Sequence, residues 1–246
     1  MRIDFFEEYP TPENLAKAKL ITFPSTVYLA AHSLAEFNQY KVKLHAVNPA
    51  LETAYWPLLP KSYWTSAFSY PNEIKKLHAE LTSYNEPLTV LLDLELPLLR
   101  PSLFVRNVLS FFYTKRLIRS LFKLCERGIT FHTAEYGWTT GRMNWFARFL
   151  SITFSEDYPF RRILMWYSSM LPRIARTWRN SLVLDTHTIV GLGTIAIGVL
   201  GNEPILSPVD LEDDLKFFNG AGISRAVIFR LGGLTGEYLS IINKYV

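Results

Sequence analysis

The sequence predicts a single (β/α)8 barrel, an α/β fold, over residues 1–246. Short apolar runs typical of buried strands alternate along the chain with segments that carry helix patterns and capping signals. The length of 246 residues is close to the roughly 250 residues of such a barrel. No repeat, low-complexity tract or flexible linker interrupts this alternation. We therefore expect one domain.

Eight apolar segments are expected to form the strands. They are 3–8, 25–31, 42–47, 88–95, 129–135, 162–167, 188–197 and 225–231. The clearest helix starts are Thr11-Pro12 and Ser207-Pro208, where an N-cap residue precedes a proline at the first helical position. Gly128 is expected to end a long basic helix over 103–127. The other expected helices are 34–39, 71–83, 142–154, 172–181 and 235–245.

An open doubly wound sheet is the main alternative fold. Such a sheet more often has a glycine-rich phosphate-binding turn after its first strand. Here Glu7-Glu8-Tyr9-Pro10 follows the first strand, which favours the barrel. Residues 48–70, after the expected third strand, are interpreted as an insertion rich in aromatic residues, with Tyr55-Trp56-Pro57 and Ser62-Tyr63-Trp64.

The composition argues against several classes of protein. A hydrophobic fraction of 49% is too high for a disordered chain. The net charge of +4 is scattered outside the helix over 103–127, so no nucleic-acid partner is expected. The lone Cys125 cannot form an internal disulfide, and the N-terminus is too acidic for a signal peptide. The longest uncharged apolar stretch, 188–201, is shorter than the roughly 20 residues that span a bilayer, so a cytoplasmic protein is expected.

The most informative stretch is the fourth strand, which ends in two acids and a proline. Because side chains alternate between the faces of a strand, Leu91, Asp93 and Glu95 share one face. An unpaired buried charge is costly, so propensity alone does not explain two carboxylates there. Active sites of parallel barrels lie at the C-terminal ends of the strands. We therefore expect Asp93 and Glu95 to open into a pocket.

Further acids and aromatic residues are expected at the same end of the barrel. Asp4, Phe6 and Glu8 are expected to face inward on the first strand, while Glu135 ends the fifth and Arg230 the eighth. The aromatic residues expected at the mouth are Tyr55, Trp56, Tyr63, Trp64, Trp138, Trp166 and Tyr167. Aromatic rings stack on the apolar faces of sugars, and two carboxylates suffice to cleave a glycosidic bond. This combination indicates a small-molecule or oligosaccharide substrate.

The Asp93-Leu94-Glu95 end of the fourth strand resembles the chitinase-type (family 18) and lysozyme-type (family 25) glycosidase barrels. The resemblance covers Leu91 to Glu95 and the general barrel layout, without the further upstream aspartates and glycine of the chitinase signature. It implies that Glu95 is the proton donor and that Asp93 supports it. Glu135, and after it Glu8, are the candidates for a second carboxylate.

Two other functions stay open at this stage. A sugar-phosphate isomerase, aldolase or lyase would bind phosphate at the glycine turn 232–236, next to Arg230. Glu237 in the first turn of the following helix and the acidic mouth argue against an anionic substrate. A non-catalytic barrel would bind a ligand or partner through its aromatic loops, with its carboxylates paired to arginines.

No cofactor or metal ion is expected, because the five histidines lack ligand spacing such as His-x-His. The basic helix over 103–127 could lie on an anionic membrane, or it could cover the barrel with its lysine and arginine stems. The second interpretation is favoured, so no membrane contact is expected. The aromatic segment 55–64 could alternatively form the interface of a homo-oligomer.

Overall fold

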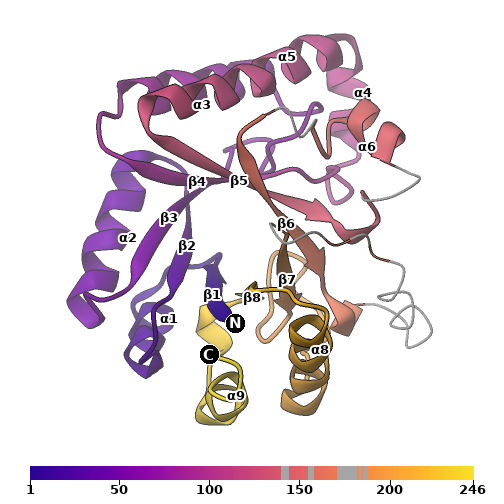
Figure 1. Cartoon of the computed structure of the whole chain (residues 1–246). Coiled ribbons are helices and arrows are strands. Elements are labelled where there is room, and N and C mark those ends of the chain that lie inside the picture. Colours follow the sequence, from indigo (N-terminus) through magenta and orange to yellow (C-terminus); the bar gives the residue numbers. More distant parts are fainter. Residues whose placement is uncertain (140–143, 155–157, 171–181, 183, 185–187) are drawn as a thin grey trace.

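The computed structural model shows a closed barrel of eight parallel strands, which confirms the predicted (β/α)8 fold (Figure 1). Each strand pairs with the next, and the last pairs with the first. The structure describes residues 1–139, 144–154, 158–170, 182, 184 and 188–246. The strands are β1 (Arg2–Glu7), β2 (Thr26–Ala31), β3 (Glu52–Pro57), β4 (Leu88–Asp93), β5 (Ile129–Tyr136), β6 (Phe160–Trp166), β7 (Ile189–Gly193) and β8 (Arg225–Phe229).

Helices surround the strands on the outside of the barrel (Figure 1). They are α1 (Pro12–Leu15), α2 (Leu34–Val47), α3 (Pro71–Ser83), α4 (Ser102–Asn107), α5 (Phe111–Leu121), α6 (Asn144–Leu150), α8 (Pro208–Gly220) and α9 (Gly236–Ile242). The expected helix over 172–181 lies outside the described residues. None of the helices that the structure describes is long and apolar enough to cross a membrane.

The local signals at the helix ends act as predicted. Thr11 and Ser207 accept hydrogen bonds from the backbone N–H groups three residues later, at the starts of α1 and α8. The basic segment 102–127 is helical almost throughout, as α4, α5 and two 3₁₀ turns. Gly128 ends this segment with a left-handed φ of +86°, a conformation that glycine adopts without steric cost.

The predicted third strand at 42–47 is wrong, because these residues form the second half of α2. Alternating Val42, Leu44 and Ala46 suggest a strand, but Ser33 caps a helix that continues through them. Leu44 packs on the barrel as part of the helical stripe, whereas the Val42 side chain is 70% exposed. The third strand is instead β3, so Tyr55 and Trp56 belong to the sheet and not to an insertion.

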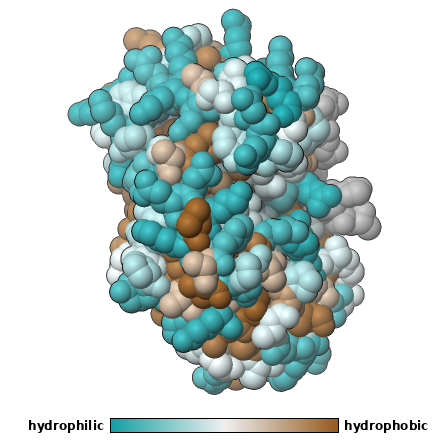
Figure 2. Space-filling view, turned by 90° about the vertical axis from the view of Figure 1, so that its left-hand side faces the viewer, coloured by the Kyte–Doolittle hydropathy of each residue, from teal (hydrophilic) through white to brown (hydrophobic). Residues whose placement is uncertain are grey.

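Alternate strand residues face two different layers. Phe6, Tyr28, Leu91 and Val227 belong to the cluster inside the barrel. The strand residues between them, such as Phe5, Leu29 and Leu92, face outward and pack against the helices. On the outer face of the molecule seen in Figure 2, hydrophilic side chains predominate and apolar ones are interspersed among them.

A polar network closes the N-terminal end of the barrel, opposite the strand ends considered below. The buried Asp4 accepts hydrogen bonds from the backbone N–H of Thr26 at 2.7 Å and from Arg225 at 2.5 Å. Deeper inside, the hydroxyl of Tyr28 hydrogen-bonds His132 at 2.7 Å. Burial lowers the pKa of His132 to about 3, so this imidazole is neutral at physiological pH. Asp4 therefore has a structural role.

Asp4→Asn is expected to lower the free energy of unfolding by about 3 kcal/mol, because it leaves the largely buried Arg225 without its counter-ion. Urea denaturation of the folded barrel measures this effect. Glu212→Gln is the matched control, since its ion pair with Lys244 is exposed and contributes at most about 1 kcal/mol. An equal decrease in the free energy of unfolding of Asp4→Asn and Glu212→Gln would contradict the structural role of Asp4.

Candidate active site

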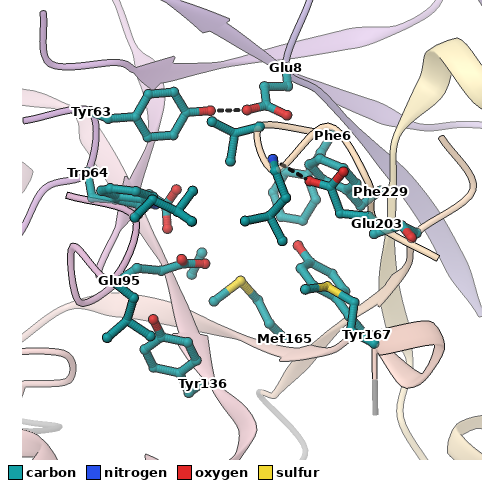
Figure 3. A pocket seen from close by; sticks show the side chains of 18 of the residues that line it. Phe6, Glu8, Tyr63, Trp64, Glu95, Tyr136, Met165, Tyr167, Glu203 and Phe229 are labelled. Carbon is teal, nitrogen blue, oxygen red and sulfur yellow. Dashed lines mark hydrogen bonds between the residues drawn. The ribbon is translucent and has the colours of Figure 1, made fainter. Parts of the chain in front are cut away.

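A cavity of about 570 Å³ opens at the C-terminal ends of the strands, where the sequence predicts the site (Figure 3). Its polar lining residues are Glu8, Tyr63, Asp93, Glu95, Tyr136, Tyr167, Thr194 and Glu203. Its inner apolar walls include Phe6, Trp56, Trp64, Leu91, Met165 and Phe229. Further apolar lining residues come from the loops after β4, β6 and β7: Leu96, Leu98, Leu99, Met170, Val199 and Leu200.

Strand alternation places three carboxyl groups in this cavity. Phe6 and Glu8 line it from the end of β1, and Asp93 and Glu95 from the end of β4. The predicted inward direction of these side chains is therefore confirmed. Figure 3 shows Glu8 and Glu95 entering the cavity from different walls. Chain segments that are remote in the sequence thus bring their acids to one space.

Glu8 is held by a tyrosine from the loop after β3. The hydroxyl of Tyr63 donates a hydrogen bond to Oε1 of Glu8 (Figure 3). Two backbone hydrogen bonds pair Tyr63 with Leu59, and the Tyr63 backbone has a left-handed φ of 72°. That conformation is disfavoured for a residue with a bulky side chain. The surrounding loop therefore imposes it, and the result aims the phenol at Glu8.

The pKa values of Glu8 and Glu95 are both raised from 4.5 to about 7. Burial is the largest cause in each case, because an apolar wall disfavours the charged form. The charge of Glu8 raises the pKa of Glu95 further, whereas the hydroxyl of Tyr63 lowers that of Glu8. Both carboxyls can therefore exchange a proton near neutral pH.

Asp93 is the most strongly perturbed acid of the site. Burial raises its pKa well above the usual range, and the charges of Glu95 and Glu8 raise it further. The site therefore favours the protonated form of Asp93, which in that form can act as a hydrogen-bond donor beside Glu95. Tyr136 and Tyr167 also have raised pKa values, so they stay neutral.

Several polar atoms of the cavity lining are buried without a hydrogen-bond partner. Within the described part of the chain these include one carboxyl oxygen each of Glu8, Asp93 and Glu203, and the indole N–H of Trp56 and of Trp166. A buried polar atom without a partner is destabilising, and such atoms are rare in native proteins. A small number of polar groups that face one apolar cavity is typical of a ligand-binding site.

Glu135 does not join the other acids. Its neighbours Ala134 and Tyr136 line the cavity, so strand alternation directs Glu135 toward the helices. There it is fully buried and forms an ion pair with Arg162 at 2.7 Å, supported by Thr133 at 2.8 Å. The carboxylate that the cavity brings together with Asp93 and Glu95 is Glu8.

Arg230 and the glycine turn are also engaged elsewhere. Glu7 accepts a hydrogen bond from Arg230 at 3.0 Å and one from the backbone N–H of Gly232 at 2.7 Å. The guanidinium of Arg230 lies over the ring of Tyr9, 4.9 Å from its centroid. The turn that could have bound phosphate therefore binds the carboxylate of Glu7, and Arg230 is not among the cavity-lining residues.

The structure separates the predicted aromatic residues into two groups. Trp56, Tyr63, Trp64, Trp166 and Tyr167 line the cavity. Tyr55 does not, because it faces the helices and packs 5.3 Å from Phe37 of α2. The side chain of Trp138 lies outside the described residues.

The sequence-based analysis did not select Glu203, Tyr136, Met165 or Phe229, all of which line the cavity. Glu203 lies ten residues after the end of β7, in a loop. A loop has no regular period from which the direction of a side chain can be predicted. It accepts a hydrogen bond from the backbone N–H of Leu200 at 2.7 Å, which folds the loop over the cavity. Tyr136 and Met165 could have been found by extending the period-two pattern of their strands.

No group of three or more His, Cys, Asp or Glu side chains suited to a metal ion occurs within the described ranges. The site as it stands is a set of carboxyl groups in an aromatic, largely apolar barrel mouth.

These features define a (β/α)8 barrel with a carboxyl-rich cavity at its C-terminal end. The sequence matches no protein-family model and no curated protein. Among solved structures, a class V chitinase from Nicotiana tobaccum is similar in fold, with a TM-score of 0.51 and 11% identity over 100% of this chain and 99% of that chain. A glycoside hydrolase family 18 N-acetylglucosaminidase from Paenibacillus barengoltzii gives a TM-score of 0.48 at 10% identity, with the same coverage. At this identity the likeness concerns the fold.

Glu95→Gln is expected to raise the free energy of unfolding by about 3 kcal/mol at pH 8 and to change it little near pH 4. The folded state binds the Glu95 proton more tightly than the unfolded state, because its pKa is about 7 rather than 4.5. The stability of the wild-type protein therefore falls as the pH rises through this range, and glutamine removes that loss.

Urea denaturation at the two pH values measures the difference. Glu237→Gln, at an exposed carboxyl on α9, is the control and should behave as wild type at both pH values. A Glu95 variant that is equally stabilised or destabilised at pH 4 and pH 8 would contradict the raised pKa.

Proposed function

We propose that this protein is a glycoside hydrolase in which Glu95 is the general acid, Asp93 supports it and Glu8 is the second carboxylate. The observation that carries the proposal is the convergence of these three carboxyl groups, with raised pKa values, in one aromatic-walled cavity. A glycosidase needs one protonated and one ionised carboxyl on either side of the scissile bond. Two groups with pKa values of about 7 can supply both forms at neutral pH.

In this proposal Glu95 donates its proton to the glycosidic oxygen, and the bond from that oxygen to the anomeric carbon breaks. The leaving group departs as an alcohol, and positive charge develops on the sugar ring. Glu8, in its ionised form, either attacks the anomeric carbon or removes a proton from the attacking water. Asp93 holds a proton beside Glu95 and stabilises the carboxylate that the first step produces.

The remaining cavity residues suit a sugar substrate. Trp56, Trp64 and Phe229 offer aromatic surfaces on which the apolar face of a pyranose can stack. Tyr136 and Tyr167, as neutral phenols, and the unpaired oxygens of Glu8 and Glu203 can exchange hydrogen bonds with hydroxyl groups. The fold shared with a chitinase makes oligosaccharides of N-acetylglucosamine the first substrates to test.

The two alternative functions, a sugar-phosphate enzyme and a non-catalytic binding barrel, have less support. None of the described residues that line the cavity is a lysine or arginine, so a phosphate group would meet carboxyls and no cationic side chain there. A non-catalytic barrel with fully paired carboxylates would have an arginine beside each acid. Arginines do pair with Glu7 and Glu135, but the described ion pairs include neither Asp93 nor Glu95.

The proposal is tested by incubating the purified protein with fluorogenic chitooligosaccharides and other glycosides across pH 5–9. Release of the fluorophore with a bell-shaped pH dependence centred near neutrality is expected, since Glu95 must be protonated and Glu8 ionised. Oligosaccharide binding by calorimetry without turnover of any glycoside would favour a binding protein instead.

Glu95→Gln is expected to lower kcat by about 10²–10⁴-fold, because glutamine cannot donate the proton to the leaving oxygen. Kinetics on the substrate found above, with circular dichroism to confirm folding, provide the measurement. Glu237→Gln is the control and should retain wild-type kcat. Undiminished turnover by Glu95→Gln would remove Glu95 from the chemistry.

A further inference from the structure

Exposed apolar side chains gather where α4 meets α5. Val105 lies in α4, Val108 and Leu109 in the 3₁₀ turn between the two helices, and Phe112 in the first turn of α5. We call these four residues the outer stripe. Leu109 is 98% exposed and Phe112 69%, so these side chains face solvent and not the barrel. An outer helix of a barrel normally has polar residues there.

The opposite side of the same segment packs on the protein. Leu103, Asn107 and Phe111 are buried, and the ring centroid of Phe111 lies 5.0 Å from that of Phe68. Asn107 donates a hydrogen bond to the carbonyl of Phe68 at 2.8 Å. The segment is therefore held against the barrel and has apolar residues on both its buried and its exposed side. Packing on the barrel explains the buried apolar residues but not the exposed ones.

Neighbouring elements extend the outer stripe. Trp145 and Phe149, one helical turn apart on α6, are both exposed, and the ring of Phe149 lies 5.9 Å from that of Phe111. The Nζ of Lys115 on α5 donates hydrogen bonds to the carbonyls of Arg148 and Phe149, which holds α6 against α5. Leu98 and Leu99, just before α4, are exposed and also line the cavity. Exposed apolar residues thus follow along the chain from the cavity lining at Leu98 to Phe112, and a concentration of exposed apolar side chains of this kind marks an interaction site.

The charge of this region is of one sign. Residues 96–125 contain six lysines and arginines and no aspartate or glutamate. Arg100, Arg106, Arg116 and Arg119 are exposed beside the apolar side chains, and Arg148 of α6 adds another exposed cation. Basic residues that flank exposed leucine, phenylalanine and tryptophan are the combination by which amphipathic helices bind anionic lipid surfaces.

We propose that the outer stripe, with Trp145 and Phe149, docks this barrel onto an anionic lipid membrane. The apolar side chains enter the boundary between headgroups and acyl chains, and the surrounding arginines bind lipid phosphates. A second copy of this chain is a poorer occupant, because a two-fold contact would bring two basic surfaces together. Because the exposed, cavity-lining Leu98 and Leu99 come directly before α4 in the chain, the docked barrel holds its cavity mouth beside the headgroups. The docking stands independently of the proposed hydrolase activity.

The test is co-sedimentation of the full-length protein with vesicles of phosphatidylcholine alone and with about 30% phosphatidylserine added. Binding is expected only to the anionic vesicles and should weaken as salt is raised. Leu109→Ser/Phe112→Ser is expected to reduce the affinity by about tenfold or more, because each substitution removes a large inserted side chain. Arg106→Gln is expected to reduce it by about fivefold.

The matched control is Val42→Ser/Val209→Ser, which removes two equally exposed apolar side chains from α2 and α8 and should bind as wild type. All the substituted positions are exposed, so folding should be retained. Absence of binding to anionic vesicles, or equal binding by the stripe and control variants, would overturn the proposal. A wild-type dimer in light scattering that the stripe substitutions convert to a monomer, with no vesicle binding, would assign the surface to a second copy instead.

Discussion

Closure of eight parallel strands into a barrel is the constraint on which the other features depend. Once the sheet closes, every strand residue must face either the enclosed interior or the helices, and the two directions alternate residue by residue. The same rule sends Phe6, Glu8, Asp93 and Glu95 into the cavity and sends Glu7 and Glu135 to arginines outside it. Adjacent acids such as Glu7 and Glu8 therefore differ in position, since Glu7 pairs with an arginine and Glu8 lines the cavity.

The cavity brings together groups that are unfavourable for folding. Glu8, Asp93 and Glu95 lie in an apolar mouth without a lysine or arginine among the described lining residues, and burial raises the pKa of all three. The ion pairs at Asp4, Glu7 and Glu135 show that the fold can neutralise a buried carboxylate. Raised pKa values in one cleft are typical of acid–base chemistry, where a proton must be held and released near neutral pH.

Exposed apolar side chains on α4, α5 and α6 form a second feature, distinct from the cavity, and in the chain they follow the cavity-lining Leu98 and Leu99. On the face seen in Figure 2, hydrophilic side chains predominate, with apolar ones among them. If both proposals hold, the enzyme acts on glycans close to a membrane. The proposed hydrolase activity and the proposed membrane docking depend on different observations, so either proposal can be wrong without affecting the other.

Local signals in the sequence located seven of the eight strands, the caps at Thr11, Ser207 and Gly128, and the inward direction of Asp93 and Glu95. These features depend on neighbouring residues and on strand and helix periods, which a sequence displays directly. Only the tertiary structure decided that 42–47 continues a helix, since Leu44 packs on the barrel while Val42 faces solvent. It likewise decided which carboxyls meet, that Glu203 joins them, and that the basic helix has an apolar outer side. Those outcomes depend on contacts between segments far apart in the chain, which no local pattern encodes.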